Sequence, residues 1–112
     1  MTIVGFSQGG MLACDALLRD GLDLAALALL SSSRIAFDEW QTQLHRLRDL
    51  PVFVSHGERD PDLAFAAGEA LRDMAVAGGA QVTWLPFDGG HEIPLVVWRG
   101  LKKFLGQMLR AT

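Results

Sequence analysis

A serine stands between two glycines near the start of the chain, in the segment GFSQGG that spans residues 5 to 10. The spacing Gly-x-Ser-x-Gly, with an apolar segment before it and a helical one after it, is typical of a sharp strand-to-helix turn that exposes the serine hydroxyl. Because such a turn is tight, we expect the residues two before and two after Ser7, which are Gly5 and Gly9, to be small. On the motif alone, the alternative interpretation is a glycine-rich loop without a catalytic role.

A serine hydroxyl is a weak nucleophile and needs a base within hydrogen-bond distance, which an acid in turn orients. The chain has three histidines. His45 lies in a charged segment where exposure to solvent is expected, and His56 ends an apolar strand where a structural hydrogen bond is the better interpretation. His91 lies in FDGGHEIP, where flexible glycines after a strand let the imidazole reach the edge of a sheet. We therefore expect His91 to be the base.

Several carboxylates are candidates for the acid. Asp60 follows a strand and a turn and precedes a helix, so we expect it at the same sheet edge as the serine. Glu58 and Asp62 lie beside it, and we expect Asp62 in the first turn of that helix, where the macrodipole favours negative charge. Asp88, close to the histidine in sequence, is the alternative acid. The chain order serine, aspartate, histidine is that of the α/β-hydrolases rather than of the two protease classes that share the triad.

The segments that hold these residues alternate between apolar strands and helices. We expect strands that end at residues 4, 30, 54 and 87, and helices over Gln8–Arg19, from Leu63 to Met74 and from Pro94 onward. Between them, the polar segment Arg34–Asp49 is expected to be irregular and to lead into an amphipathic helix. This alternation predicts βαβ units and a parallel sheet, whose sites form beyond the carboxyl ends of the strands. The three candidate side chains should therefore meet at one edge.

Composition and charge exclude several function classes. The 112 residues are 50% hydrophobic, which suits one small domain with a core, and the net charge of −3 without a Lys/Arg cluster argues against nucleic acid as a partner. No apolar run reaches the ~18 residues that indicate a membrane span. We see no Cys/His cluster with metal-ligand spacing, no phosphate loop and no dinucleotide fingerprint, so no metal or cofactor is expected.

The chain has a single cysteine, Cys14, which is relevant to the cellular location of the protein. It cannot form an internal disulfide, and its apolar surroundings predict a buried small residue rather than a reactive thiol. The first ten residues, MTIVGFSQGG, have no charged region ahead of an apolar one, so they do not read as a signal peptide. We expect a cytoplasmic protein.

Three segments, GFSQGGMLA, PVFVSHGERDPDL and WLPFDGGHEIP, resemble the corresponding parts of the phospholipase/carboxylesterase family of α/β-hydrolases, which includes acyl-protein thioesterases and bacterial carboxylesterases. The resemblance implies that Ser7 is the nucleophile, Asp60 the orienting acid and His91 the general base. Gln8, whose backbone N–H stands at a helix N-terminus, matches the oxyanion-hole residue of the family. The implied reaction is hydrolysis of a small-molecule acyl ester, thioester or lysophospholipid through an acyl-serine intermediate.

Apolar residues near the expected site are candidates for the walls that hold an acyl chain. We expect this role for Phe6, Met11 and the segment from Ile35 to Trp40. Trp40 could equally fill the core, and this is the expected place of the other two tryptophans, Trp84 and Trp98.

The resemblance covers the C-terminal half of the family's fold. Family members carry four or more strands and two helices before the nucleophile strand, including the loop that supplies a second oxyanion N–H, whereas only Met1 to Val4 precede the turn here. We therefore expect one partial α/β-hydrolase domain over residues 1–112, with about four parallel strands and an unpaired edge at the first. Because an uncovered edge favours pairing, the alternative is a weak or inactive fragment that acts as an interaction module or homo-oligomer. A dienelactone hydrolase, usually cysteine-based, is disfavoured by the serine.

Overall fold

The four segments expected to be strands form one parallel sheet in a computed structural model, which describes residues 1–111. The strands are β1 (Thr2–Phe6), β2 (Ala26–Leu30), β3 (Pro51–Gly57) and β4 (Gln81–Phe87), and they lie side by side in chain order. The predicted parallel α/β architecture is confirmed. Two strands run longer than expected, because the pairing with a neighbour continues to Phe6 in β1 and to Gly57 in β3.

Strand β2 is buried along its whole length, although its sequence, ALALL, favours a helix. Its residues alternate between the two faces of the sheet. Leu27 and Leu29 belong to one core cluster, whereas Ala26, Ala28 and Leu30 belong to the other. Burial on both faces therefore outweighs intrinsic helix propensity in this central strand.

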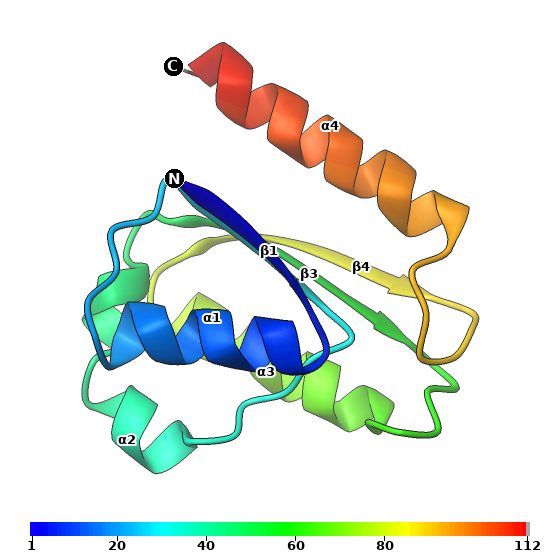
Figure 1. Ribbon diagram of the computed structural model, residues 1–112, viewed down its shortest axis with the longest axis horizontal. Helices are drawn as coiled ribbons and strands as arrows, with labels where there is room; N and C mark the ends of the chain where they lie inside the picture. The colour runs from blue at the N-terminus through cyan, green and yellow to red at the C-terminus, as the bar shows by residue number, and fades with distance from the viewer. Residues whose placement is uncertain (112) are drawn as a thin grey trace.

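Helices cover both faces of the sheet. Helices α1 (Gln8–Leu18), α2 (Phe37–Gln41) and α3 (Phe65–Ala77) lie on one face, and α4 (Leu95–Ala111) lies on the opposite face (Figure 1). The expected last helix forms, and its residues Val97, Leu101 and Phe104 are buried against the sheet. In contrast, Trp98 on the same helix is 50% exposed, so the expectation that it fills the core is wrong. Trp84, half-buried on β4, does pack against the core.

The polar segment Arg34–Asp49 forms no continuous amphipathic helix. It contains the short helix α2 and a single 3₁₀ turn, η1 (Leu44–Leu47), in place of the helix that was expected. Trp40 from the first and Leu47 from the second both enter the core cluster beneath α1. Both parts of the segment therefore pack onto the same core.

Cys14 lies in the core beside α1's other buried residues, as predicted. Burial raises the pKa of its thiol to about 12, and the neighbouring negative charge of Asp15 acts in the same direction. A thiol that stays protonated at neutral pH is a poor nucleophile.

Helices long and apolar enough to cross a bilayer are absent from the part of the chain that the structure describes.

Candidate active site

Ser7 forms the turn between β1 and α1 in a strained backbone conformation. Its φ of 55° and ψ of −116° are rare for any residue with a side chain. Four hydrogen bonds of its backbone hold it there. Its N–H donates to the carbonyl of Leu30 at 2.8 Å. Its own carbonyl accepts from the N–H groups of Gly10 at 3.1 Å and Met11 at 3.3 Å, and from Oγ of Ser32 at 2.8 Å.

The glycines around Ser7 are not equally constrained. A Cβ on Gly5 would lie 2.5 Å from the backbone nitrogen of Gly10, so the expectation for Gly5 is confirmed. The expectation for Gly9 is wrong, since a Cβ there would meet no described atom within 4 Å. Gly10 is the second position of the turn that has no room for a side chain, because a Cβ there would lie 2.7 Å from Oγ of Ser32. The first turn of α1 points Gly9 toward solvent and Gly10 toward the β2 loop.

His91 lies between Ser7 and Asp60. Its Nε2 is 3.0 Å from Oγ of Ser7, and its Nδ1 is 2.7 Å from Oδ2 of Asp60. A carboxylate only accepts hydrogen bonds, so Nδ1 carries the proton and Nε2 is free to accept from the serine hydroxyl. The three residues follow β1, β3 and β4, so the carboxyl ends of the strands bring them together, as the sequence predicted.

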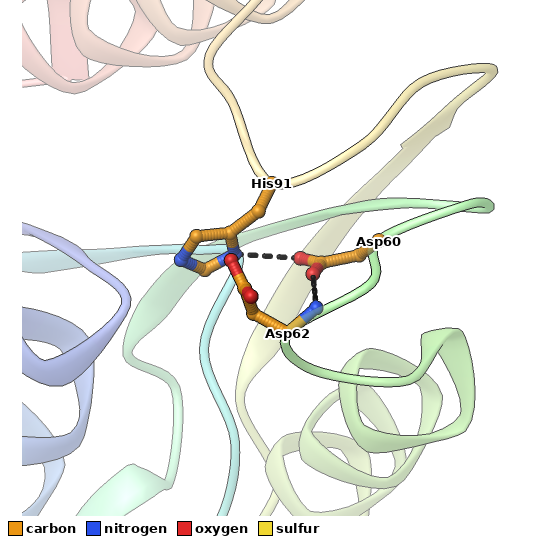
Figure 2. A group of neighbouring side chains, drawn as sticks. All are labelled: Asp60, Asp62 and His91. Atoms are coloured by element: carbon orange, nitrogen blue, oxygen red, sulfur yellow. Dashed lines mark hydrogen bonds and ion pairs between the residues drawn. The ribbon is translucent and has the colours of Figure 1, made fainter.

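Asp60 is buried, and backbone and side-chain donors hold its carboxylate. Its Oδ1 accepts from the N–H groups of Asp62 at 2.8 Å and Leu63 at 2.9 Å, and Figure 2 shows its carboxylate facing the ring of His91. Burial on its own would raise the pKa of Asp60, but the hydrogen bonds from Leu63, His91 and Asp62 outweigh it and lower the pKa below its usual range. Asp60 is therefore ionised at neutral pH.

The other candidate acids lie elsewhere. The side chain of Asp88 is 80% exposed and pairs with Arg59 at 3.0 Å, so it does not serve His91. Glu58 is exposed as well. Asp62 lies in the loop before α3, because that helix begins only at Phe65, and the prediction that Asp62 occupies the first helical turn is wrong.

Asp60, Asp62 and His91 together offer three ligand atoms within 4.8 Å of one another (Figure 2). The side chains of Asp60 and His91 already have hydrogen-bond partners. Both oxygens of Asp60 accept N–H groups, and Nδ1 of His91 donates to one of them. A protonated ring nitrogen cannot bind a metal ion through that atom. We therefore assign no metal to this group.

Gln8 is the first residue of α1 and is exposed. The N–H groups of the first helical turn have no acceptor inside the helix, and the macrodipole makes this end positive. The backbone N–H of Gln8 thus stands next to Ser7 at a helix end suited to a developing negative charge.

The expected apolar walls fall into two groups. Phe6 is 38% exposed, and its ring centroid lies 4.9 Å from that of His91. Met11 is half-buried on α1, and Ile35 is exposed. Trp40 has no exposed surface, and its indole N–H donates to Oδ1 of Asp15 at 2.9 Å. The prediction that it lines a substrate pocket is wrong, and the alternative that it fills the core is confirmed.

Ser32 lies near the site and makes a contact that the sequence did not predict. Ser32 supports the turn at Ser7, and its place in a run of serines after β2 was the available signal. The expected structural hydrogen bond of His56 is confirmed, since Nε2 lies 2.8 Å from the carbonyl oxygen of Leu63. His45 is exposed, as expected.

A parallel sheet covered by helices on both faces, with a serine, a histidine and an aspartate hydrogen-bonded in series beyond its strand ends, defines the α/β-hydrolase class. Within that class, the model of the phospholipase/carboxylesterase family matches residues 1–109, so the chain belongs to this family. Comparison with curated protein sequences found no match.

Solved structures share this fold. Acyl-protein thioesterase 2 of Zea mays superposes with a TM-score of 0.86 at 18% identity, over 96% of this chain and 55% of that one. A variant of Arabidopsis thaliana SOBER1 gives 0.82 at 25% identity, and esterase PE8 gives 0.84 at 25% identity, each over 96% of this chain. The alignments cover 53% of the SOBER1 variant and 49% of esterase PE8. The chain therefore spans about half the length of the structures it matches.

Proposed function

We propose that this chain carries the catalytic residues of a serine hydrolase that cleaves carboxylic esters or thioesters. The observation that carries the proposal is the continuous series of hydrogen bonds from Ser7 Oγ through His91 to Asp60, at 3.0 and 2.7 Å. Membership of the phospholipase/carboxylesterase family supports the reaction class. The names of the similar structures, a thioesterase and an esterase, support the same class.

The proposed reaction has two halves. In the first, Oγ of Ser7 attacks the acyl carbonyl carbon while Nε2 of His91 takes the hydroxyl proton, and His91 then gives that proton to the leaving alcohol or thiol. In the second, His91 takes a proton from water as the water oxygen attacks the acyl-serine, and the proton returns to Ser7 as the acid leaves. Asp60 stays ionised throughout and stabilises the imidazolium.

The developing oxyanion needs hydrogen-bond donors beside the nucleophile. We assign one to the backbone N–H of Gln8, because it stands at the N-terminus of α1 next to Ser7. A single donor of this kind typically contributes about 10²–10³ in turnover. The exposed ring of Phe6 beside His91, with Met11 on α1, supports an acyl chain as the group bound next to the serine.

Intact mass after treatment with a fluorophosphonate tests the proposal. The expected result is a single adduct that is lost in Ser7→Ala and retained in Ser33→Ala, a matched serine substitution outside the hydrogen-bonded series. Hydrolysis of aryl esters of increasing acyl length, measured on the same proteins, then tests the apolar walls. An adduct that persists in Ser7→Ala would place the reactive hydroxyl elsewhere and refute the assignment.

The exposed edge of the sheet favours a second candidate function, that of a catalytically weak fragment that pairs with another chain. Within residues 1–111, β1 pairs only with β2, and Val4 on it is 44% exposed. A cavity of about 730 Å³ along α4, partly lined by Trp98 and Leu105, leaves further apolar surface open. An unpaired, apolar strand edge is a template for association.

Light scattering after size exclusion distinguishes the two functions. A dimer that takes up no fluorophosphonate, and that Val4→Lys converts to a monomer, would favour the fragment. A monomer that forms the Ser7 adduct would exclude it. The matched control is Thr83→Lys, since Thr83 is an exposed residue of the other edge strand, β4.

A further inference from the structure

A second histidine lies beneath the candidate site. His56, near the end of β3, has no exposed surface and is not part of the series of hydrogen bonds that joins Ser7, His91 and Asp60. Its Nε2 is 2.8 Å from the carbonyl oxygen of Leu63 and 3.6 Å from Oδ2 of Asp60. A carbonyl only accepts, so Nε2 carries the hydrogen and points it at Leu63.

The ring of His56 is locked by its packing. A Cβ on Gly68 of α3 would lie 2.5 to 2.6 Å from Cβ, Cγ and Nδ1 of His56, so the ring lies directly against the helix backbone. The ring of Phe65 meets it edge-on at 6.2 Å between centroids. Within residues 1–111, Nδ1 is buried and has no hydrogen-bond partner. The fold thus tolerates an unpaired polar atom, which is costly, while the other ring nitrogen holds Leu63.

Leu63 connects this histidine to the acid. Its N–H donates to Oδ1 of Asp60 at 2.9 Å, and its carbonyl accepts from His56. The loop between β3 and α3, residues 58–64, is held at its start, where the N–H groups of Glu58 and Arg59 donate to the carbonyls of Phe87 and Gly89 at 2.8 and 2.9 Å. Further along the loop, the bonds of Leu63 run to Asp60 and His56. The contact from His56 therefore ties the loop to a central strand at the residue whose N–H holds the carboxylate.

We propose that His56 is a positioning residue, which sets the orientation of the Asp60 carboxylate toward His91 by anchoring Leu63 to β3. The inference rests on the proposed function for its effect on the reaction, while the anchoring itself is independent of it. His56 touches neither the substrate nor the reacting atoms in this role.

Amide hydrogen exchange tests the anchoring without any catalysis. In His56→Leu, which fills the space but cannot donate, we expect the amides of Asp62 and Leu63 to exchange about 10-fold faster, while that of Leu29 in β2 is unchanged. In His56→Gln, whose amide nitrogen lies about as far along the side chain as Nε2, we expect protection to return. Unchanged exchange at Asp62 and Leu63 would overturn the proposal, as would an equal increase at Leu29.

The rate of fluorophosphonate labelling tests the effect on the reaction. We expect His56→Leu to label about 10- to 100-fold more slowly than the unchanged chain, and His56→Gln to recover most of that loss. If His56 acts through Asp60, then adding His56→Leu to Asp60→Ala should cost nothing further. A loss of equal size in both backgrounds would show general destabilisation and overturn the proposal.

The two measurements separate the proposals. If the unchanged chain takes up no fluorophosphonate, the proposed function fails for this chain, and the exchange of Asp62 and Leu63 still decides whether His56 anchors the loop. If labelling occurs but neither exchange nor labelling responds to His56→Leu, the positioning role alone is refuted.

Discussion

Oγ of Ser32 lies 2.8 Å from the carbonyl oxygen of Ser7 and donates to it. The loop after β2 thereby supports the strained turn after β1, in addition to the bond from the N–H of Ser7 to Leu30 at 2.8 Å. The two contacts come from Leu30 and Ser32, which lie two residues apart at the end of the neighbouring strand. They indicate that the unusual backbone of Ser7 is maintained by long-range contacts and not by the turn residues alone.

Removing the Ser32 hydroxyl should loosen the turn. We expect Ser32→Ala to lower the free energy of unfolding by about 1 kcal/mol, since the carbonyl of Ser7 loses one of its donors, and to slow fluorophosphonate labelling of Ser7. Urea unfolding and labelling rates on the same samples measure both effects. Ser33→Ala is the matched control, and equal behaviour of the two variants would contradict the role given to Ser32.

The glycines at positions 9 and 10 should respond in opposite directions to alanine. Gly9→Ala adds a side chain in open space on a helix, so we expect it to raise the free energy of unfolding by about 0.5–1 kcal/mol. Gly10→Ala pushes a Cβ against Ser32 and should lower that free energy by about 1–3 kcal/mol. Urea midpoints compare the pair directly, and a larger loss at Gly9 would contradict the structure of the turn.

Substitution should distinguish the two candidate acids. We expect Asp60→Asn to slow labelling of Ser7 by about 10³–10⁴-fold, because an amide no longer orients His91 or stabilises its charged form. Asp88→Asn removes only an exposed ion pair with Arg59 and should change labelling less than about 2-fold. The comparison is made at saturating reagent and neutral pH. A large effect of Asp88→Asn alone would reassign the acid.

Stability should depend on pH through Asp60. Its pKa is lower in the folded chain than the usual 3.8, so the unfolded chain binds more protons in the range between the two values. The stabilisation from Asp60 is therefore fully present above the usual pKa and is lost as pH falls through the folded one. We expect the urea midpoint to fall on acidification below about pH 4, with a shallower fall in Asp60→Asn. Parallel curves for the two proteins would contradict the assignment.

Local patterns in the sequence were sufficient to predict the architecture of the sheet. They also predicted that the side chains of Ser7, Asp60 and His91 lie close together. Strand and helix periods, the glycines around Ser7 and the order of Ser7, Asp60 and His91 along the chain are properties of short segments. Parallel strands joined by helices carry their carboxyl ends to one edge, so residues that follow those strands meet there. The sequence also predicted the burial of Cys14, which lies in an apolar run.

Tertiary contacts decided the remaining features. Gly10, not Gly9, faces the loop after β2, and Trp40 enters the core instead of facing a substrate. The position of both residues depends on which side of their helix packs against another element. Asp62 stays in a loop because α3 begins later than its pattern suggested. The contact of Ser32 with Ser7 spans 25 residues of sequence. No short-range pattern encodes such contacts, because they arise only when separate strand ends are brought together by the folded sheet.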